Sequence, residues 1–187
     1  KAEQKEIISK LKSSIINLIA RFYDIQKGEI LVDGKNVQEL DKYNLREKIG
    51  IVLQDVFLFT GNIKENIRLN EKDIDMEKIK DVAQYVNADK FIDKLPKKYD
   101  EPVTERGSTL SAGQRQLLAF ARTLAFNPDI LVLDEATANI DTETEILIQD
   151  AMEKLTEDRT TLIVAHRLST IQHADKIIVL HKGEILD

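Results

Sequence analysis

The 187-residue chain has no cysteine, which excludes both a disulfide framework and a thiolate metal site and suits a reducing compartment. It also lacks a dense basic cluster, because its 27 Lys and Arg residues are outnumbered by 33 Asp and Glu residues, for a net charge of −6. Such clusters bind the phosphate backbone, so no nucleic-acid partner is expected. The chain shows neither an internal repeat nor a low-complexity segment.

Long apolar runs are missing as well. The longest, Leu117 to Phe126, is interrupted by Arg122 and falls well short of the roughly 20 residues that span a bilayer. Residues 1–6 carry charges of both signs and lack the apolar core of a signal peptide. We therefore expect one soluble domain, or a core with a subdomain, whose link to any membrane is made through a partner.

What the chain does contain is an alternation of short apolar runs and helical patterns. The runs at 49–53, 130–134, 161–165 and 176–180 are typical of strands covered on both faces. Helical patterns separate these runs, which predicts a mainly parallel sheet in an α/β fold.

Three local patterns add detail to this α/β core. Apolar residues at helical spacing predict an amphipathic helix from about residue 4 to 22. Alternation between Gly28 and Gly34 predicts a strand and a turn. Thr142 and Glu145 have the spacing of a capping box at the start of a helix.

The block at 56–125 has a different character from the rest of the chain. It contains three helical patterns, at 74–86, 88–95 and 111–126. We expect this block to be a helical subdomain inserted into an α/β core formed by residues 1–55 and 126–187.

Two adjacent carboxylates, Asp134 and Glu135, end the apolar run at 130–133. The end of a parallel strand delivers side chains to the crevice where α/β proteins bind ligands. In a phosphoryl-transfer site, one carboxylate can hold Mg²⁺ while its neighbour orients the attacking water. A solvated turn or the cap of a following helix is the alternative for such a pair standing alone.

Upstream, the stretch from Leu110 to Gln114 (Leu-Ser-Ala-Gly-Gln) opens an apolar-periodic helix. Its serine hydroxyl, its free N–H groups and the helix dipole favour an anion such as phosphate. An ordinary serine N-cap with a small-residue contact would explain Ser-x-Gly alone. It does not explain Arg115 and Gln116 after the motif, or the Glu105 to Gly107 lead-in before it.

Two more polar residues stand where predicted strands end. Gln54 ends one strand and His166 follows another, so both are expected at the sheet edge that carries Asp134. Taken singly, a polar residue ending a strand and a surface or satisfied core histidine are ordinary features. We predict that Gln54, Asp134 and His166 converge at one edge of the sheet.

Together these motifs resemble the nucleotide-binding domain of ATP-binding cassette (ABC) transporters. The stretch from Leu110 to Gln114 resembles the signature motif, and the strand ending in Asp134 and Glu135 resembles the Walker B strand. Gln54 resembles the Q-loop glutamine and His166 the switch histidine. Six motifs in the right order make the resemblance specific, and it covers roughly residues 12 to 187.

The resemblance implies a RecA-like fold of the P-loop NTPase type, with ATP and Mg²⁺ as cofactors. It implies an ATPase that couples MgATP hydrolysis to export by a transporter of the multidrug, lipid or peptide type. The stretch from Asp55 to Ile67 matches exporter-type members, where it faces the transmembrane partner. The implied partners are therefore the transmembrane domain of an exporter, at the cytoplasmic face of the cell membrane, and a second nucleotide-binding domain paired head to tail.

The resemblance also gives the motif residues their expected roles. Glu135 would polarise the attacking water, and His166 would hold the γ-phosphate. Asp134, Gln54 and Ser13 would hold the metal. The implied ATP-binding residues are Lys12, Ser13, Ser14, Gln54, Ser111, Gly113, Gln114 and Asp141. Of these, Ser111, Gly113 and Gln114 would serve the nucleotide of the second domain.

One part of the family pattern is altered. A P-loop reads Gly-x-x-x-x-Gly-Lys-Ser/Thr after a strand, because glycines let the backbone curl around phosphates. Lys12 and Ser13 resemble the end of that motif, but Glu6 and Leu11 stand where the two glycines belong. The preceding residues continue the helical stripe, which would turn the loop amides into helix hydrogen bonds. We therefore expect the chain by itself to bind ATP weakly or not at all, which leaves its ATPase activity open.

Residues 1–11 lie outside the resemblance, and three origins stay open for them: an engineered replacement, a natural degeneration, or a join across absent residues. No upstream strand or adenine-stacking aromatic precedes Lys12, and the family's closing helices do not follow Asp187, so truncated ends are expected. The alternative function is an engineered or degenerate ABC-type scaffold, an interaction module that neither binds nor hydrolyses ATP on its own. A DNA-repair or chromosome-organising ATPase fits less well, because no extended heptads occur.

Overall fold

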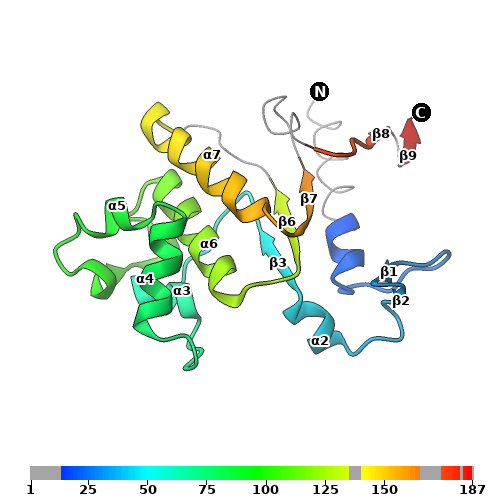
Figure 1. Ribbon diagram of the computed structural model, residues 1–187, viewed down its shortest axis with the longest axis horizontal. Coiled ribbons are helices and arrows are strands. Elements are labelled where there is room, and N and C mark those ends of the chain that lie inside the picture. Colours follow the sequence, from blue (N-terminus) through cyan, green and yellow to red (C-terminus); the bar gives the residue numbers. More distant parts are fainter. Residues whose placement is uncertain (1–13, 135–139, 165–173, 182, 187) are drawn as a thin grey trace.

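The computed structural model describes residues 14–134, 140–164, 174–181 and 183–186. Its centre is a parallel sheet with the strand order β3 (Ile49–Val52), β6 (Ile130–Asp134), β7 (Thr160–Val164) (Figure 1). The three strands are aligned from their first residues, so their carboxyl ends meet at one edge. The predictions of parallel strands at 49–53, 130–134 and 161–165 are confirmed to within one residue.

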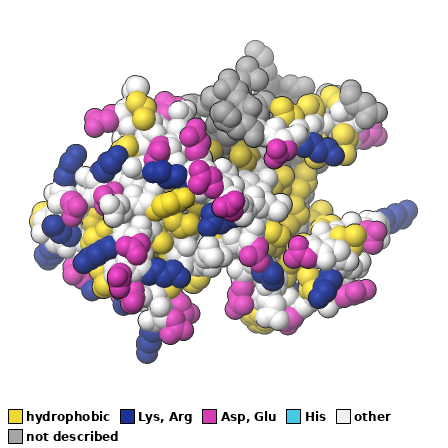
Figure 2. Space-filling view, viewed as in Figure 1, with side chains coloured by type: hydrophobic (Ala, Val, Ile, Leu, Met, Phe, Trp, Pro, Cys, Tyr) yellow, Lys and Arg dark blue, Asp and Glu magenta, His cyan; other side chains and the backbone are white. Residues whose placement is uncertain are grey.

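The prediction of a fourth parallel strand at 176–180 is wrong for the described residues. β8 (Val179–His181) instead pairs antiparallel with β9 (Glu184–Leu186), across a turn at Gly183, whose φ is +89°. A local hairpin satisfies backbone groups that would otherwise need a neighbouring parallel strand. Figure 2 shows apolar side chains on the surface of this hairpin, at the upper right.

Side chains of the central sheet alternate between two covered faces. Ile49 and Val132 face the helix at 14–19 and α2 (Lys42–Glu47), where they join a small apolar cluster. Leu131 and Leu133 face the opposite way, into a larger cluster with α6 (Ala112–Phe126) and α7 (Thr142–Thr156). Helix, sheet and helix thus form three layers, each buried Leu side chain contributing about 1.5–3 kcal/mol. The predicted α/β class with a parallel sheet is confirmed.

The first described helix, at 14–19, ends earlier than the predicted residue 22. Arg21 has a φ of +50°, the N–H of Phe22 donates to the carbonyl of Asn17 at 2.8 Å, and the N–H of Arg21 donates to Leu18 at 3.1 Å. These two bonds and the left-handed residue form a Schellman ending, which closes the helix before the apolar pattern runs out. The predicted helix at 4–13 lies outside the described residues.

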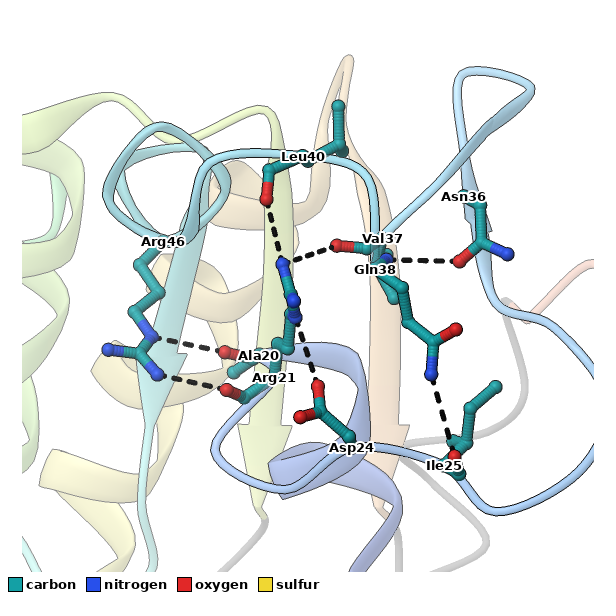
Figure 3. Close-up of polar contacts among 9 residues, drawn as sticks. All are labelled: Ala20, Arg21, Asp24, Ile25, Asn36, Val37, Gln38, Leu40 and Arg46. Carbon is teal, nitrogen blue, oxygen red and sulfur yellow. Dashed lines mark hydrogen bonds and ion pairs between the residues drawn. The ribbon is translucent and has the colours of Figure 1, made fainter.

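Two arginines fasten the end of that helix to the rest of the core (Figure 3). Arg46 donates to the carbonyls of Ala20 at 3.1 Å and Arg21 at 2.9 Å, which are helix-end acceptors without an intrahelical partner. Arg21 in turn donates to the carbonyls of Val37 at 3.1 Å and Leu40 at 2.8 Å. The helix is therefore held at the end opposite to the sheet's carboxyl edge.

Between that helix and α2 lies a small hairpin of β1 (Leu31–Val32) and β2 (Lys35–Asn36). Asp33 and Gly34 at its tip have φ values of +50° and +75°, the conformation of a two-residue hairpin turn. The predicted strand and turn at 28–34 are confirmed.

The block at 56–125 is mostly helical, and the three helices predicted there are present. Its elements are β4 (Gly61–Asn62), α3 (Ile63–Arg68), α4 (Met76–Tyr85), α5 (Asp89–Ile92), η1 (Lys98–Asp100), β5 (Pro102–Val103), η2 (Glu105–Gly107) and α6. One continuous apolar cluster joins this block to α7 and to one face of the sheet. The division into a core and a subdomain at residues 56–125 stays a prediction.

Candidate functional site

The carboxyl edge of the parallel sheet brings two predicted site residues together. Val52 is paired with Leu133 in the parallel ladder. The residue after Val52 is therefore level with Asp134, and Gln54 follows one residue further along the chain. Asp134 is half-buried and Gln54 is exposed. On the other side, Val164 at the end of β7 lies beside Asp134. Of the predicted convergence of Gln54, Asp134 and His166 at one edge, the part that concerns Gln54 and Asp134 is therefore confirmed, and His166 lies outside the described residues.

Several predicted site residues lie outside the described residues. They are Lys12, Ser13, Glu135 and His166. The altered phosphate-loop positions, Glu6 and Leu11, lie outside as well. Ser14 is described and exposed at the start of the helix at 14–19, whose first turn points toward the carboxyl edge of the sheet (Figure 1). The roles predicted for these four residues and for Ser14 stay predictions.

The donors at this edge suit a hard divalent cation. Within the described ranges, Asp134 forms no ion pair with a Lys or Arg, and no three His, Cys, Asp or Glu side chains gather as a metal cluster. Mg²⁺ is typically held by one or two carboxylates together with water and substrate phosphates rather than by an all-protein cage. A half-buried carboxylate and an amide oxygen at the same edge of the sheet fit that pattern, so Asp134 and Gln54 could hold the metal.

The predicted signature motif forms the start of α6 with a complete capping box. Ser111 Oγ accepts from the N–H of Gln114 at 3.2 Å, and Gln114 Oε1 accepts from the N–H of Ser111 at 3.0 Å. Ser111 is exposed, and its hydroxyl keeps a hydrogen to donate. The cap and the predicted contact with phosphate are therefore compatible.

Gly113 has a packing role that its predicted phosphate contact does not require. A Cβ built at Gly113 would overlap the side chain of Thr144 and lie 3.3 Å from Cγ2 of Ile140. The missing side chain lets the start of α6 press against the start of α7. The signature motif thereby adjoins Ile140 and the start of α7.

The predicted capping box of Thr142 and Glu145 is wrong. The N-cap of α7 is Asp141, whose carboxylate accepts from the N–H of Thr144 at 2.9 Å. That hydrogen bond holds the pKa of Asp141 below its usual value of 3.8. Asp is a stronger N-cap than Thr, which explains the one-residue difference. The predicted contact of Asp141 with ATP stays a prediction.

Two shallow hollows lie away from the predicted site. One, of about 270 Å³, is lined by Tyr85 of α4, Leu124 of α6 and Arg159 among others. The second, of about 170 Å³, includes Lys48 and Thr160 at the amino ends of the strands. Neither includes a predicted site residue.

The sequence did not single out a polar cluster beneath the loop that follows Gln54. Buried Asn66 of α3 and half-buried Arg122 of α6 hold the backbone of this loop through hydrogen bonds. One signal was available, because Arg122 is the charge that interrupts the longest apolar run of the chain. A long charged side chain in such a run indicates that it forms hydrogen bonds with polar groups away from solvent.

The fold and this edge together define the class: an α/β protein whose parallel strands carry polar residues at the edge where such proteins bind ligands. Comparison with known proteins gives the family: residues 12–138 match the ABC transporter family model. The chain belongs to the ABC transporter family. The match begins at Lys12, where the resemblance in the sequence was predicted to begin.

Individual relatives give the same picture. The chain is 54% identical over 176 residues to "Probable multidrug resistance ABC transporter ATP-binding/permease protein YheH" of Bacillus subtilis (strain 168), covering 94% of this chain and 26% of that protein. It is 48% identical to "Uncharacterized ABC transporter ATP-binding protein YfiC" of the same organism, covering 94% of this chain and 29% of that protein.

A solved structure supports the fold as well as the family. It is described as a bacterial Atm1-family ABC exporter with ATP bound, with a TM-score of 0.86 and 42% identity, covering 94% of this chain and 31% of that chain. The chain thus spans less than a third of these relatives. Among the described residues, no helix has the length and apolar character needed to cross a membrane.

Proposed function

We propose that this chain is the nucleotide-binding domain of an ABC exporter, which binds and hydrolyses MgATP. The observation that carries the proposal is the meeting of Gln54 and Asp134 at the carboxyl edge of the sheet, where α/β proteins bind ligands. The relative described as an ATP-binding/permease protein and the exporter with bound ATP support it.

In the proposed mechanism, the residues at this edge divide the work of phosphoryl transfer. Asp134, Gln54 and Ser13 would hold the metal, which would supply charge neutralisation on the phosphates. Glu135 orients the attacking water and takes up its proton. His166 donates a hydrogen bond to the γ-phosphate.

The other phosphate contacts come from two helix starts. Ser14 opens the helix at 14–19, Lys12 precedes it in the sequence, and Ser111, Gly113 and Gln114 open α6. These two helices cover opposite faces of the sheet (Figure 1). In the proposed assembly, the two starts therefore contact different nucleotides. Two domains paired head to tail would place one domain's signature motif on the nucleotide of the other.

The loop after Gln54 is the proposed contact with a transmembrane partner. Phe57 and Phe59 are exposed there, next to the edge that would hold the nucleotide. Exposed neighbouring aromatic rings are typical of protein interfaces. Export would follow if hydrolysis at the edge changed the position of this loop. The proposed location is therefore the cytoplasmic face of the membrane.

The substitution Glu135→Gln tests the hydrolysis step. It removes the charge that orients water but keeps the size of the side chain, so turnover should fall by ~10²-fold or more. Binding of MgATP should be retained. Phosphate release and calorimetric titration measure the two quantities. Glu153→Gln, on the exposed side of α7, is the matched control and should leave turnover unchanged. Unchanged turnover in Glu135→Gln would mean that Glu135 is only a cap or surface residue.

Calorimetric titration of the wild-type chain with MgATP tests the alternative of a scaffold that does not bind ATP. The comparisons lend that alternative no support. It is based on Glu6 and Leu11, on the helical stripe before Lys12 and on the missing adenine-stacking aromatic. Micromolar affinity would overturn the prediction of weak binding. If binding is absent, the double substitution Glu6→Gly and Leu11→Gly should restore it, because glycines let the loop curl around phosphate.

A further inference from the structure

Phe57 and Phe59, the aromatic pair, lie on the surface although Leu58 between them is fully buried. Their exposed fractions are 51% and 52%, and their ring centroids are 5.1 Å apart with planes at 80°. Extended backbone sends successive side chains to opposite sides, so burial of Leu58 turns both rings outward. The loop has no helix or strand of its own here, so other elements must fix its position.

Asn66 of α3 fixes the backbone at Phe59, the second residue of the aromatic pair. Its Oδ1 accepts from the N–H of Phe59 at 2.8 Å, and its Nδ2 donates to the carbonyls of Phe59 at 2.8 Å and Asn62 at 3.0 Å. The side-chain amide therefore pairs with Phe59 as a neighbouring strand would. Asn66 is almost completely buried, which makes these bonds strong and their loss costly.

Arg122 of α6 holds the same loop from the other side. Its Nη1 donates to the carbonyl of Phe57 at 3.0 Å, its Nε to the carbonyl of Asn66 at 2.8 Å, and its Nη2 to Oδ1 of Asn66 at 3.1 Å. Its guanidinium carbon also lies 5.7 Å from the centroid of the Phe59 ring. One side chain thus reaches both members of the aromatic pair and the asparagine that supports them.

The surroundings of Arg122 favour a positioning role over simple packing. Burial lowers its pKa, and no carboxylate among the described residues pairs with it. A partly buried charge with only neutral oxygen partners is a costly way to fill space. What the guanidinium supplies is a rigid fork with several donors, which a lysine ammonium cannot reproduce.

α6 carries Arg122 near one end and the signature motif at the other. It runs without interruption from Ala112 to Phe126, with Ser111 as its N-cap. A straight helix moves as a unit, so a displacement at Ser111 also displaces Arg122. We propose that Arg122 is a positioning residue that ties the aromatic pair to the signature helix, so that a shift of α6 moves the pair against its partner. This inference rests on the proposed function for the identity of the partner.

Amide hydrogen exchange on the whole chain tests the positioning step. Arg122→Lys keeps the charge but loses the fork, so exchange of the Phe59 amide should become about tenfold faster. The amide of Phe120, inside α6, should not change. Arg159→Lys is the matched control: Arg159 also donates to backbone carbonyls, those of Pro128 and Leu155, but away from the loop. An unchanged Phe59 amide in Arg122→Lys would overturn the proposal.

The ATPase of the exporter that carries this domain tests the coupling step. In Arg122→Lys, basal hydrolysis should stay within about twofold of the wild type, while its stimulation by transported substrate should fall about fivefold or more. Arg159→Lys should keep the stimulation. Full stimulation in Arg122→Lys, with faster Phe59 exchange, would show a structural role only and overturn the coupling. If the wild-type exporter hydrolyses no ATP, the proposed function fails, and the exchange experiment still decides whether Arg122 positions the pair.

Discussion

Helix α6 and the C-terminal hairpin are both rich in apolar residues, yet only α6 is covered. α6 buries nine of its residues between the sheet, the neighbouring helices and α7. The hairpin and the residues just before it leave six large apolar side chains 39–66% exposed: Ile177, Ile178, Val179, Leu180, Ile185 and Leu186. An apolar pattern therefore shows that burial of a segment would be favourable. Whether the segment is buried depends on which other elements pack against it.

The largest expected difference between the two regions concerns the free energy of unfolding. Phe120→Ala in α6 should lower it by about 3–5 kcal/mol, because the ring is almost completely buried and leaves a cavity. Ile185→Ala in the hairpin should change it by no more than about 0.5 kcal/mol, because the side chain is mostly exposed. Urea-induced unfolding followed by circular dichroism measures both. A similar loss in the two variants would mean that the hairpin is covered in solution.

A smaller effect is expected where α6 meets α7. Gly113→Ala should lower the free energy of unfolding by about 1–3 kcal/mol, because the new methyl group overlaps the side chain of Thr144. Thr144→Ser removes the methyl group in the way and should recover most of this loss in the double variant. A double-mutant cycle measured by urea unfolding gives the coupling between the two sites. If the losses simply add, Gly113 is not constrained by packing against α7.

The sequence predicted the elements whose signals are local. β3, β6 and β7 follow from their apolar runs, and their polar ends identify Gln54 and Asp134 as edge residues. The start of α6 follows from its serine and glutamine. Each of these depends on residues within a few positions of one another.

The features that the sequence did not predict depend on contacts between distant segments. Asn66 and Arg122 are 56 positions apart, and only the folded chain brings them together. The strand run at 176–180 was correctly seen as apolar, but its pairing with β9 depends on which neighbour is available. The N-cap of α7 lies one residue before the predicted N-cap, because Asp141 caps the helix in place of Thr142.

The N-cap at the signature end of α6 should contribute less to the free energy of unfolding than the packing of Gly113 against α7. Ser111→Ala removes the acceptor for the N–H of Gln114 and should lower the free energy of unfolding by about 1 kcal/mol. Ser111→Asp should restore the loss, because a carboxylate also caps a helix start. Urea unfolding of the two variants measures the difference. Equal loss in both would mean that the hydroxyl serves something other than the cap.

The smallest effect concerns the pH dependence of the α7 cap. The hydrogen bond from Thr144 lowers the pKa of Asp141 in the folded chain below its usual value of 3.8, so the folded state favours the charged carboxylate. Its contribution to stability is present above the unfolded pKa and is lost as the pH falls through the folded pKa. Asp141→Asn keeps an oxygen acceptor but removes the titration, so other carboxylates cancel in the comparison. The difference in unfolding free energy between wild type and Asp141→Asn should be constant near about pH 6 and should shrink toward about pH 3. Because Asp141 is exposed, the change should be small, and a difference that is independent of pH would show that the charge adds nothing to the cap.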